Sequence, residues 1–82
     1  MNEIKVFSAP WCAGCKVVKN VLKKEGIEFE EIDITTGEGV KLAKEIGIKS
    51  IPVTTFEGMQ FIGSDPKTIA TLLQIAKGVY FD

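Results

Sequence analysis

A strand pattern changes to a helix pattern at the two cysteines of this chain, and this junction constrains the fold more than any other feature. Residues 3–8 have the pattern of a short strand, with apolar side chains at positions 4, 6 and 7. Over residues 15–25 the apolar side chains fall on one stripe at helical spacing, formed by Val17, Val18, Val21 and Leu22. A turn at residues 9–11 joins the two patterns. The sequence therefore predicts a strand followed by a helix whose first turn carries Cys12 and Cys15.

The spacing of these cysteines indicates redox chemistry. Two thiols on one helical turn can close or open a disulfide ring without moving the rest of the chain. Unpaired N–H groups at a helix start stabilise an anion, and they lower a cysteine pKa from about 8.5 to roughly 3.5–7.5. We therefore predict that Cys12 is the nucleophile. Cys15, one turn further in, is expected to be more buried and to resolve a mixed disulfide, and Lys16 is placed to add positive charge beside Cys12.

Two other roles for the cysteines have to be weighed. A closed zinc site needs about four nitrogen or sulfur ligands, whereas this chain has two Cys and no His. Only a metal shared between chains, or completed by an added thiol, would fit. A structural disulfide in so short a loop would stabilise the fold little, because the entropic gain grows with loop length. We predict no cofactor and no resident metal, and we keep a thiol metal-binding module as an alternative of a different functional class.

Composition limits the remaining functions. The 82 residues suffice for one domain and are too few for two, so we predict a single domain over residues 1–82. All ten basic residues are Lys, and without Arg a nucleic-acid partner is not expected. The four lysines within 16–24 are most simply a solvated helix face, although they could steer an acidic partner. The N-terminus has neither a signal-peptide pattern nor a membrane span, so we expect a cytoplasmic protein with no membrane partner. Nothing exposed in the pattern demands more than a monomer, and a monomer is therefore expected.

The middle of the chain predicts a second strand and a second helix. Residues 27–34 are rich in β-formers, but Glu and Asp are interleaved with them, which suits an edge strand. Thr35 and Glu38 have the spacing of a capping box. A helix is therefore expected to begin at Thr35 and to stop at Gly47.

The last third of the chain predicts a hairpin and a third helix. Residues 53–56 and 59–62 are two short strand patterns on either side of Glu57-Gly58. Asp65 before Pro66 is typical of a helix start. The apolar stripe of this helix consists of Ile69, Leu72, Leu73 and Ala76. The order β-α-β-α-β-β-α predicts an α/β fold with a four-stranded mixed sheet flanked by three helices.

Four short motifs stand in a characteristic order: Trp11-Cys12-Ala13-Gly14-Cys15, Ile51-Pro52, Phe61-Ile62-Gly63 and Ser64-Asp65-Pro66. With these motifs the chain resembles the thioredoxin-fold superfamily over essentially its whole length, as a small glutaredoxin-like redox protein. The resemblance implies the thioredoxin fold. It also implies a cis peptide bond before Pro52, with the backbone of Ile51 placed to pair with the extended chain of a bound substrate.

The sequence departs from both main branches of this superfamily. Val6 stands where thioredoxins have a buried acid, and Ala13-Gly14 stands where they have Gly-Pro. The aromatic residue usual between glutaredoxin cysteines is absent, and the glutaredoxin Gly-Gly-x-Asp-Asp motif is reduced to Gly63-Ser64-Asp65-Pro66. The sequence is most similar to small glutaredoxin-like thioredoxins, which include electron donors of ribonucleotide reductase.

The resemblance and the cysteine pair predict an enzyme, a thiol-disulfide oxidoreductase that reduces protein disulfides with Cys12 and Cys15. The expected substrates are disulfide-containing proteins, among them ribonucleotide reductase. A thioredoxin reductase-like flavoprotein or glutathione is expected to recycle the oxidised protein. Substrate contacts are assigned to Trp11, Ile51 and Pro52.

Two alternatives concern the residues around the cysteines. One is a glutathione-dependent glutaredoxin, in which Lys5, Ile51 and Asp65 would contact the tripeptide. The other alternative concerns the role of Trp11. Our expectation is that its ring shields one side of the sulfurs and forms an apolar contact surface for partners. Trp11 could instead be an ordinary buried aromatic residue.

Overall fold

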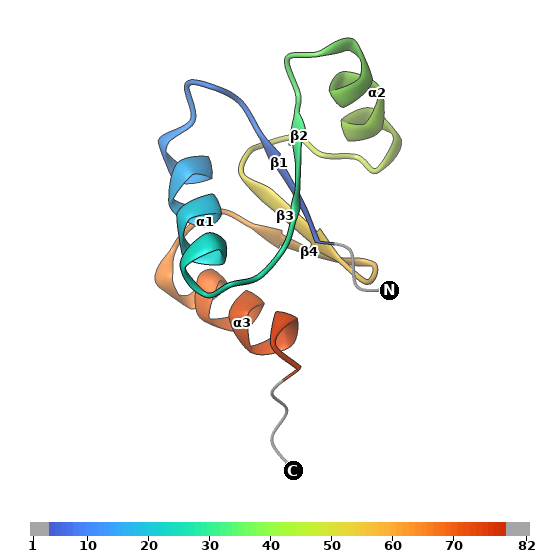
Figure 1. The fold of residues 1–82 in the computed structure, drawn as a ribbon. Helices are drawn as coiled ribbons and strands as arrows, with labels where there is room; N and C mark the ends of the chain where they lie inside the picture. Colours follow the sequence, from blue (N-terminus) through green and yellow to red (C-terminus); the bar gives the residue numbers. More distant parts are fainter. Residues whose placement is uncertain (1–3, 79–82) are drawn as a thin grey trace.

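In the described part of the chain, four short strands form one mixed sheet in the spatial order β2-β1-β3-β4 (Figure 1). The structure is a computed structural model and describes residues 4–78. β1 (Lys5–Ser8) pairs in parallel with β2 (Glu30–Asp33) and antiparallel with β3 (Val53–Phe56). β3 continues through a tight turn into the antiparallel β4 (Met59–Ile62). The predicted mixed four-stranded sheet is confirmed.

Within residues 4–78, three helices cover the two faces of this sheet (Figure 1). α1 (Ala13–Lys24) and α3 (Pro66–Ala76) pack on one face, where their buried residues meet those of β1, β3 and β4. α2 (Gly37–Glu45) packs on the other face, against β1, β2 and β3. The order and layering of the elements confirm the predicted thioredoxin fold.

β1 is buried on both faces because it lies inside the sheet between the two helical layers. Val6 faces α1 and α3, whereas Phe7 faces α2, and both side chains are almost completely buried. β2 lies at the edge of the described sheet, as its interleaved charges predicted. Glu30 and Glu31 are exposed there, while Ile32 packs beside Phe7 in the core.

The start of α2 differs from the prediction by one residue. Thr36, not Thr35, caps the helix, because the Thr36 Oγ1 accepts a hydrogen bond of 3.0 Å from the Gly39 N–H. Thr35 instead donates its N–H and hydroxyl to the Asp33 carboxylate, at 2.8 and 2.6 Å. The predicted Thr35–Glu38 capping box is therefore wrong: the Asp33 carboxylate competes successfully for Thr35.

The other two turn predictions are confirmed. Asp65 caps α3 by accepting from the Thr68 N–H, and Pro66 is the first helical residue. Glu57 and Gly58 have φ angles of 50° and 80°, which is the left-handed conformation that a two-residue hairpin turn of type I′ requires.

Some predictions fall outside residues 4–78. Glu3, predicted to begin the first strand, and the tail 79–82 lie outside the described residues. The single domain over residues 1–82 stays a prediction. Within the part of the chain that the structure describes, no helix is both long and apolar enough to cross a membrane.

Candidate active site

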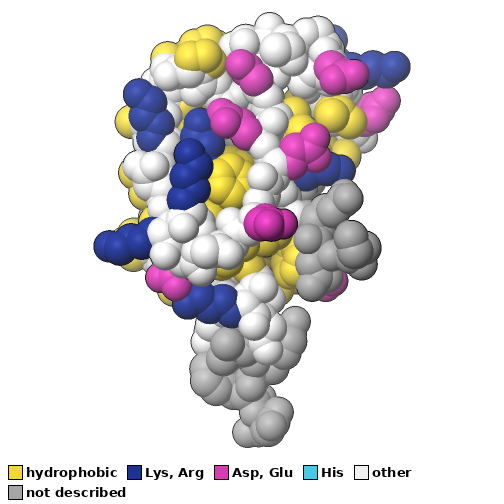
Figure 2. Space-filling model, in the orientation of Figure 1, with side chains coloured by type: hydrophobic (Ala, Val, Ile, Leu, Met, Phe, Trp, Pro, Cys, Tyr) yellow, Lys and Arg dark blue, Asp and Glu magenta, His cyan; other side chains and the backbone are white. Residues whose placement is uncertain are grey.

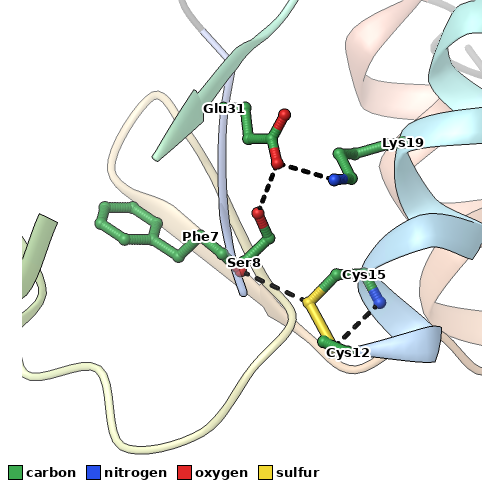
Figure 3. The surroundings of a disulfide bond; sticks show 6 residues. All are labelled: Phe7, Ser8, Cys12, Cys15, Lys19 and Glu31. Atoms are coloured by element: carbon green, nitrogen blue, oxygen red, sulfur yellow. Dashed lines mark hydrogen bonds and ion pairs between the residues drawn. A yellow bond between two sulfur atoms is a disulfide. The ribbon is translucent and has the colours of Figure 1, made fainter. Parts of the chain in front are cut away.

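A disulfide joins Cys12 to Cys15 where β1 leads into α1 (Figure 3). Their Cα atoms are 5.2 Å apart. Cys12 is the N-cap of α1, and its sulfur accepts a hydrogen bond of 3.1 Å from the Cys15 N–H. The sulfur thus occupies the place that a Ser or Asp oxygen takes in an ordinary helix cap. The prediction that both cysteines lie on the first turn of this helix is confirmed.

The two sulfurs differ in their exposure. Cys15 is completely buried, whereas Cys12 is partly exposed. The Cys15 Sγ lies 3.9 Å from the carbonyl oxygen of Phe7, an oxygen that a thiol at this position can approach as a donor. The roles of Cys12 as nucleophile and Cys15 as resolving cysteine stay predictions, and this difference in exposure supports them.

The helix start provides the positive end of a dipole beside Cys12. The free N–H groups of the first turn and the aligned peptide dipoles favour a negative charge there. The first turn of α1 contains no acidic residue that would oppose this effect. When the disulfide is opened, the Cys12 sulfur is therefore in a place that suits a thiolate.

Pro52 lies close to the first turn of α1. The Ile51–Pro52 peptide bond is cis, as the family resemblance implied. A Cβ atom built on Gly14 would lie 3.3 Å from Pro52 Cδ and 2.9 Å from Ser64 Oγ, so the helix backbone packs closely on both residues. The Pro52 carbonyl accepts a hydrogen bond of 2.9 Å from the Gly63 N–H, which fixes the loop after β4 beside the site.

Ile51 is half-buried and packs against the core cluster on the α2 face of the sheet. Its backbone adjoins the cis bond. The assignment of Ile51 and Pro52 to substrate binding stays a prediction.

An exposed aromatic side chain lies directly beside Cys12. Trp11, next to Cys12, is 74% exposed, so the alternative of a buried aromatic residue is wrong. Ile62, at the end of β4 before Gly63, is 59% exposed. Sequence analysis did not assign Ile62 a role, although its alternation with the buried Phe61 indicates a side chain on the opposite face. The predicted contact of Trp11 with partners stays a prediction.

A polar network that the sequence analysis missed lies behind Cys15 (Figure 3). The hydroxyl of the completely buried Ser8 donates to Glu31 Oε2 at 2.9 Å, and the Lys19 ammonium group lies 2.7 Å from the same oxygen. The hydrogen bond from Lys19, followed by that from Ser8, lowers the pKa of Glu31 below its ordinary value. Glu31 is therefore an anion at neutral pH.

Lys5, one of the three residues predicted to contact glutathione, lies apart from the disulfide. Lys5 begins β1, at the end of the strand away from the disulfide, and its side chain lines a hollow of about 200 Å³ with Phe7 and Leu42 on the α2 side. Asp65 caps α3, where its carboxylate accepts from the N–H and the hydroxyl of Thr68. This arrangement does not favour the glutathione alternative.

Three of the four α1 lysines agree with a solvated helix face, whereas Lys19 is partly buried and paired with Glu31. Lys16, Lys23 and Lys24 are exposed, and Figure 2 shows Lys side chains gathered on the side of the molecule that α1 occupies. Within residues 4–78, no group of three or more His, Cys, Asp or Glu side chains is placed to hold a metal ion.

Residues 4–60 match the family model described as glutaredoxin. The chain belongs to the glutaredoxin family. Among its relatives, the glutaredoxin-like protein NrdH of Lactococcus lactis is 36% identical over 70 residues, which cover 84% of this chain and 97% of that protein. The chloroplastic M-type thioredoxin of Chlamydomonas reinhardtii is 34% identical in an alignment of length 77 that covers 83% of this chain. This glutaredoxin-family chain spans only 54% of that thioredoxin's own length.

Solved structures agree with this family membership. The glutaredoxin of Archaeoglobus fulgidus superposes with a TM-score of 0.75 at 26% identity, over 90% of this chain and 88% of that chain. This protein therefore has the fold and the disulfide-bonded cysteine pair of a thiol-disulfide oxidoreductase.

Proposed function

We propose that this protein is a thiol-disulfide oxidoreductase that reduces disulfides in other proteins. One observation carries the proposal: a disulfide at a helix start joins a partly exposed sulfur, Cys12, to a completely buried one, Cys15. Only the Cys12 sulfur of such a pair can exchange with a sulfur of another protein. Partner disulfides can approach Cys12, while Cys15 meets only the sulfur of Cys12.

The reaction consists of two exchange steps. In the reduced protein the Cys12 thiolate attacks one sulfur of the target disulfide, which forms a mixed disulfide and releases the other target sulfur as a thiolate. Cys15 then attacks the Cys12 sulfur, and the second target sulfur is released. Two electrons pass from the cysteine pair to the target, the two thiol protons end on the target sulfurs by way of water, and the Cys12–Cys15 disulfide forms.

The surroundings of the sulfurs suit a protein substrate. Trp11 presents an exposed apolar ring next to Cys12, and exposed Trp side chains are common at contact sites for protein partners. We propose that the backbone of Ile51, next to the Pro52 that packs on the first turn of α1, pairs with an extended segment of the partner. We include ribonucleotide reductase among the proposed partners, because the small glutaredoxin-like thioredoxins that this sequence resembles include its electron donors.

The proposed reductant is a thioredoxin reductase-like flavoprotein. Glutathione is the second candidate, which the match to the glutaredoxin family model favours. Two observations oppose glutathione. Lys5 lies on the α2 side of the sheet, and the Asp65 carboxylate caps α3. Thioredoxin reductase is therefore the reductant that the described site suits better.

Insulin reduction tests both the function and the reductant. The purified protein is assayed with NADPH and a flavoprotein thioredoxin reductase, and separately with glutathione, NADPH and glutathione reductase. We expect turnover in the first system and little in the second. Cys12→Ser serves as the inactive control. If neither system, nor dithiothreitol as a chemical donor, supports reduction above this control, the proposed function is wrong.

We further propose that the protein acts as a monomer in the cytoplasm. A disulfide reductase needs a compartment whose thiol pool keeps its cysteines reduced. Size-exclusion chromatography and cell fractionation test these two statements. A stable dimer, or recovery outside the cytoplasmic fraction, would contradict them.

A further inference from the structure

Cys15 is buried, yet it has to carry a negative charge when it attacks the mixed disulfide. Burial disfavours the ionised form of a thiol. Lys19 follows Cys15 by four residues on α1, and this separation places two side chains on the same helix face with their Cβ atoms about 5–6 Å apart. A cation is thus available one helical turn from the buried sulfur.

Lys19 is held in this place by residues from two strands (Figure 3). Its ammonium group lies 2.7 Å from Glu31 Oε2 on β2, and that oxygen also accepts the hydroxyl of Ser8 on β1 at 2.9 Å. The Lys19 side chain is only 18% exposed. The neighbouring Lys23 is exposed. Lys19 therefore differs from a solvated surface lysine in having a fixed position.

The network is connected directly to the strand that touches Cys15. Ser8 follows Phe7, whose carbonyl oxygen lies 3.9 Å from the Cys15 Sγ. The strand segment next to the sulfur therefore also anchors the carboxylate that holds Lys19. Because Ser8 is completely buried, its hydroxyl has no water to replace Glu31 as a partner.

We propose that Lys19, held by Glu31 and Ser8, is a positioning residue whose ammonium group stabilises the Cys15 thiolate in the second exchange step. This inference rests on the proposed function. The Cys15 thiolate attacks the Cys12 sulfur of the mixed disulfide, the bond between Cys12 and the target breaks, and the Cys12–Cys15 bond forms. The electron pair leaves on the target sulfur, which takes a proton from water and so replaces the proton that Cys15 gave up.

Other charged groups near this face of the sheet have partners or lie apart. On β2, Asp33 accepts two hydrogen bonds from Thr35, which lower its pKa, and the charge of Lys19 lowers this pKa further. At the start of α3, Asp65 accepts two from Thr68. Lys16 of α1 is exposed, and Lys5 of β1 lines the hollow on the opposite face. β3 and β4 contain no charged residue.

Direct titration of Cys15 tests the proposal. In the Cys12→Ser background, the ultraviolet absorbance of the Cys15 thiolate is followed against pH. Lys19→Gln is expected to raise the midpoint by about half a unit to one unit, because it removes a cation and leaves the Glu31 carboxylate without its counter-ion. Lys19→Arg, which keeps the charge, should hold the midpoint near that of the parent. Lys23→Gln, the control one turn further along α1, should leave it unchanged.

A double variant separates charge from structure. Lys19→Gln with Glu31→Gln removes both charges, so its midpoint should lie nearer the parent than that of Lys19→Gln alone. A change that acted only through a disturbed fold would not be reversed by a second substitution in the same network. Far-UV circular dichroism of each variant checks that it is folded.

The outcomes are distinct. Equal midpoints for Lys19→Gln and the parent would overturn the inference, and so would an equal shift in the single and double variants. Insulin reduction by the wild-type protein is measured alongside. If the wild type reduces insulin but the titration does not respond to Lys19, only this inference fails. If the wild type reduces nothing, the proposed function itself fails.

Discussion

Gly39 lies in the first turn of α2 where the helix backbone meets the end of β2, and a methyl group has no room there. A Cβ atom built on Gly39 would lie 1.8 Å from the carbonyl oxygen of Asp33 and 3.0 Å from Thr36 Oγ1, whereas an ordinary contact is at least 3.4 Å. The obstacle at 1.8 Å is a backbone atom, which cannot rotate away. In Gly39→Ala, the start of α2 therefore has to move away from β2 by more than an ångström.

This movement costs stability in two ways. It breaks the hydrogen bond of 3.0 Å from the Gly39 N–H to the Thr36 cap, whose loss costs about 1 kcal/mol. It also strains the contact between helix and sheet, at about 1–3 kcal/mol for overpacking. The better helix propensity of Ala offsets up to about 1 kcal/mol. The expected net loss is about 2 kcal/mol in the free energy of unfolding.

Urea unfolding followed by circular dichroism measures this loss as a lower midpoint with an unchanged slope. Gly37→Ala is the matched control, because it lies in the same helix and a Cβ atom there meets nothing within 4 Å. We expect its midpoint to equal that of the wild type or to exceed it slightly. A Gly39→Ala midpoint as high as that of Gly37→Ala would refute the steric reasoning.

Three further predictions concern the site. Cys15→Ser should accumulate a stable mixed disulfide with a target protein, detectable on non-reducing gels. Cys12→Ser should trap nothing, and trapping by this variant would reverse the assigned roles of the two cysteines. Trp11→Ala should lower the rate of insulin reduction about 3–10-fold while the urea midpoint stays unchanged, because the ring is exposed; a loss of several kcal/mol in stability would instead mark Trp11 as a core residue. The pKa of Glu31 is lowered from its ordinary value of 4.5 by Lys19 and then Ser8, so its contribution to stability should be complete above that value and should vanish as pH falls through the lowered pKa. The stability difference between wild type and Glu31→Gln, followed from neutral to acid pH, should shrink accordingly, and a difference that grew on acidification would contradict the sign.

Where the sequence predicted well, the physical determinants are local. The stripe at helical spacing after Cys15 needs only its own residues to be recognised, and the same holds for Asp65-Pro66 and Glu57-Gly58. The helix start at Cys12 followed from such local patterns. The edge position of β2 was also readable, because a strand so rich in charge cannot be buried on both faces.

Where the prediction failed, two local choices had similar energies. Thr35 and Thr36 can both cap a helix, and the sequence spacing favoured Thr35 because Glu38 completes a capping box. The end of β2 decided between them, since the Asp33 carboxylate engages Thr35 and leaves Thr36 to accept from the Gly39 N–H. The ends of short strands are similarly set by pairing with neighbours.

The sequence by itself determined the order of the elements and the presence of a reactive cysteine pair at a helix start, because both depend on residues a few positions apart. Family resemblance added the cis bond at Pro52. Only the tertiary structure decided what lies behind Cys15. Ser8, Lys19 and Glu31 are far apart along the chain, and they meet because parallel pairing sets β2 beside β1 while α1 packs over both strands. No local pattern carries that information, since register and helix docking are properties of the whole packed sheet.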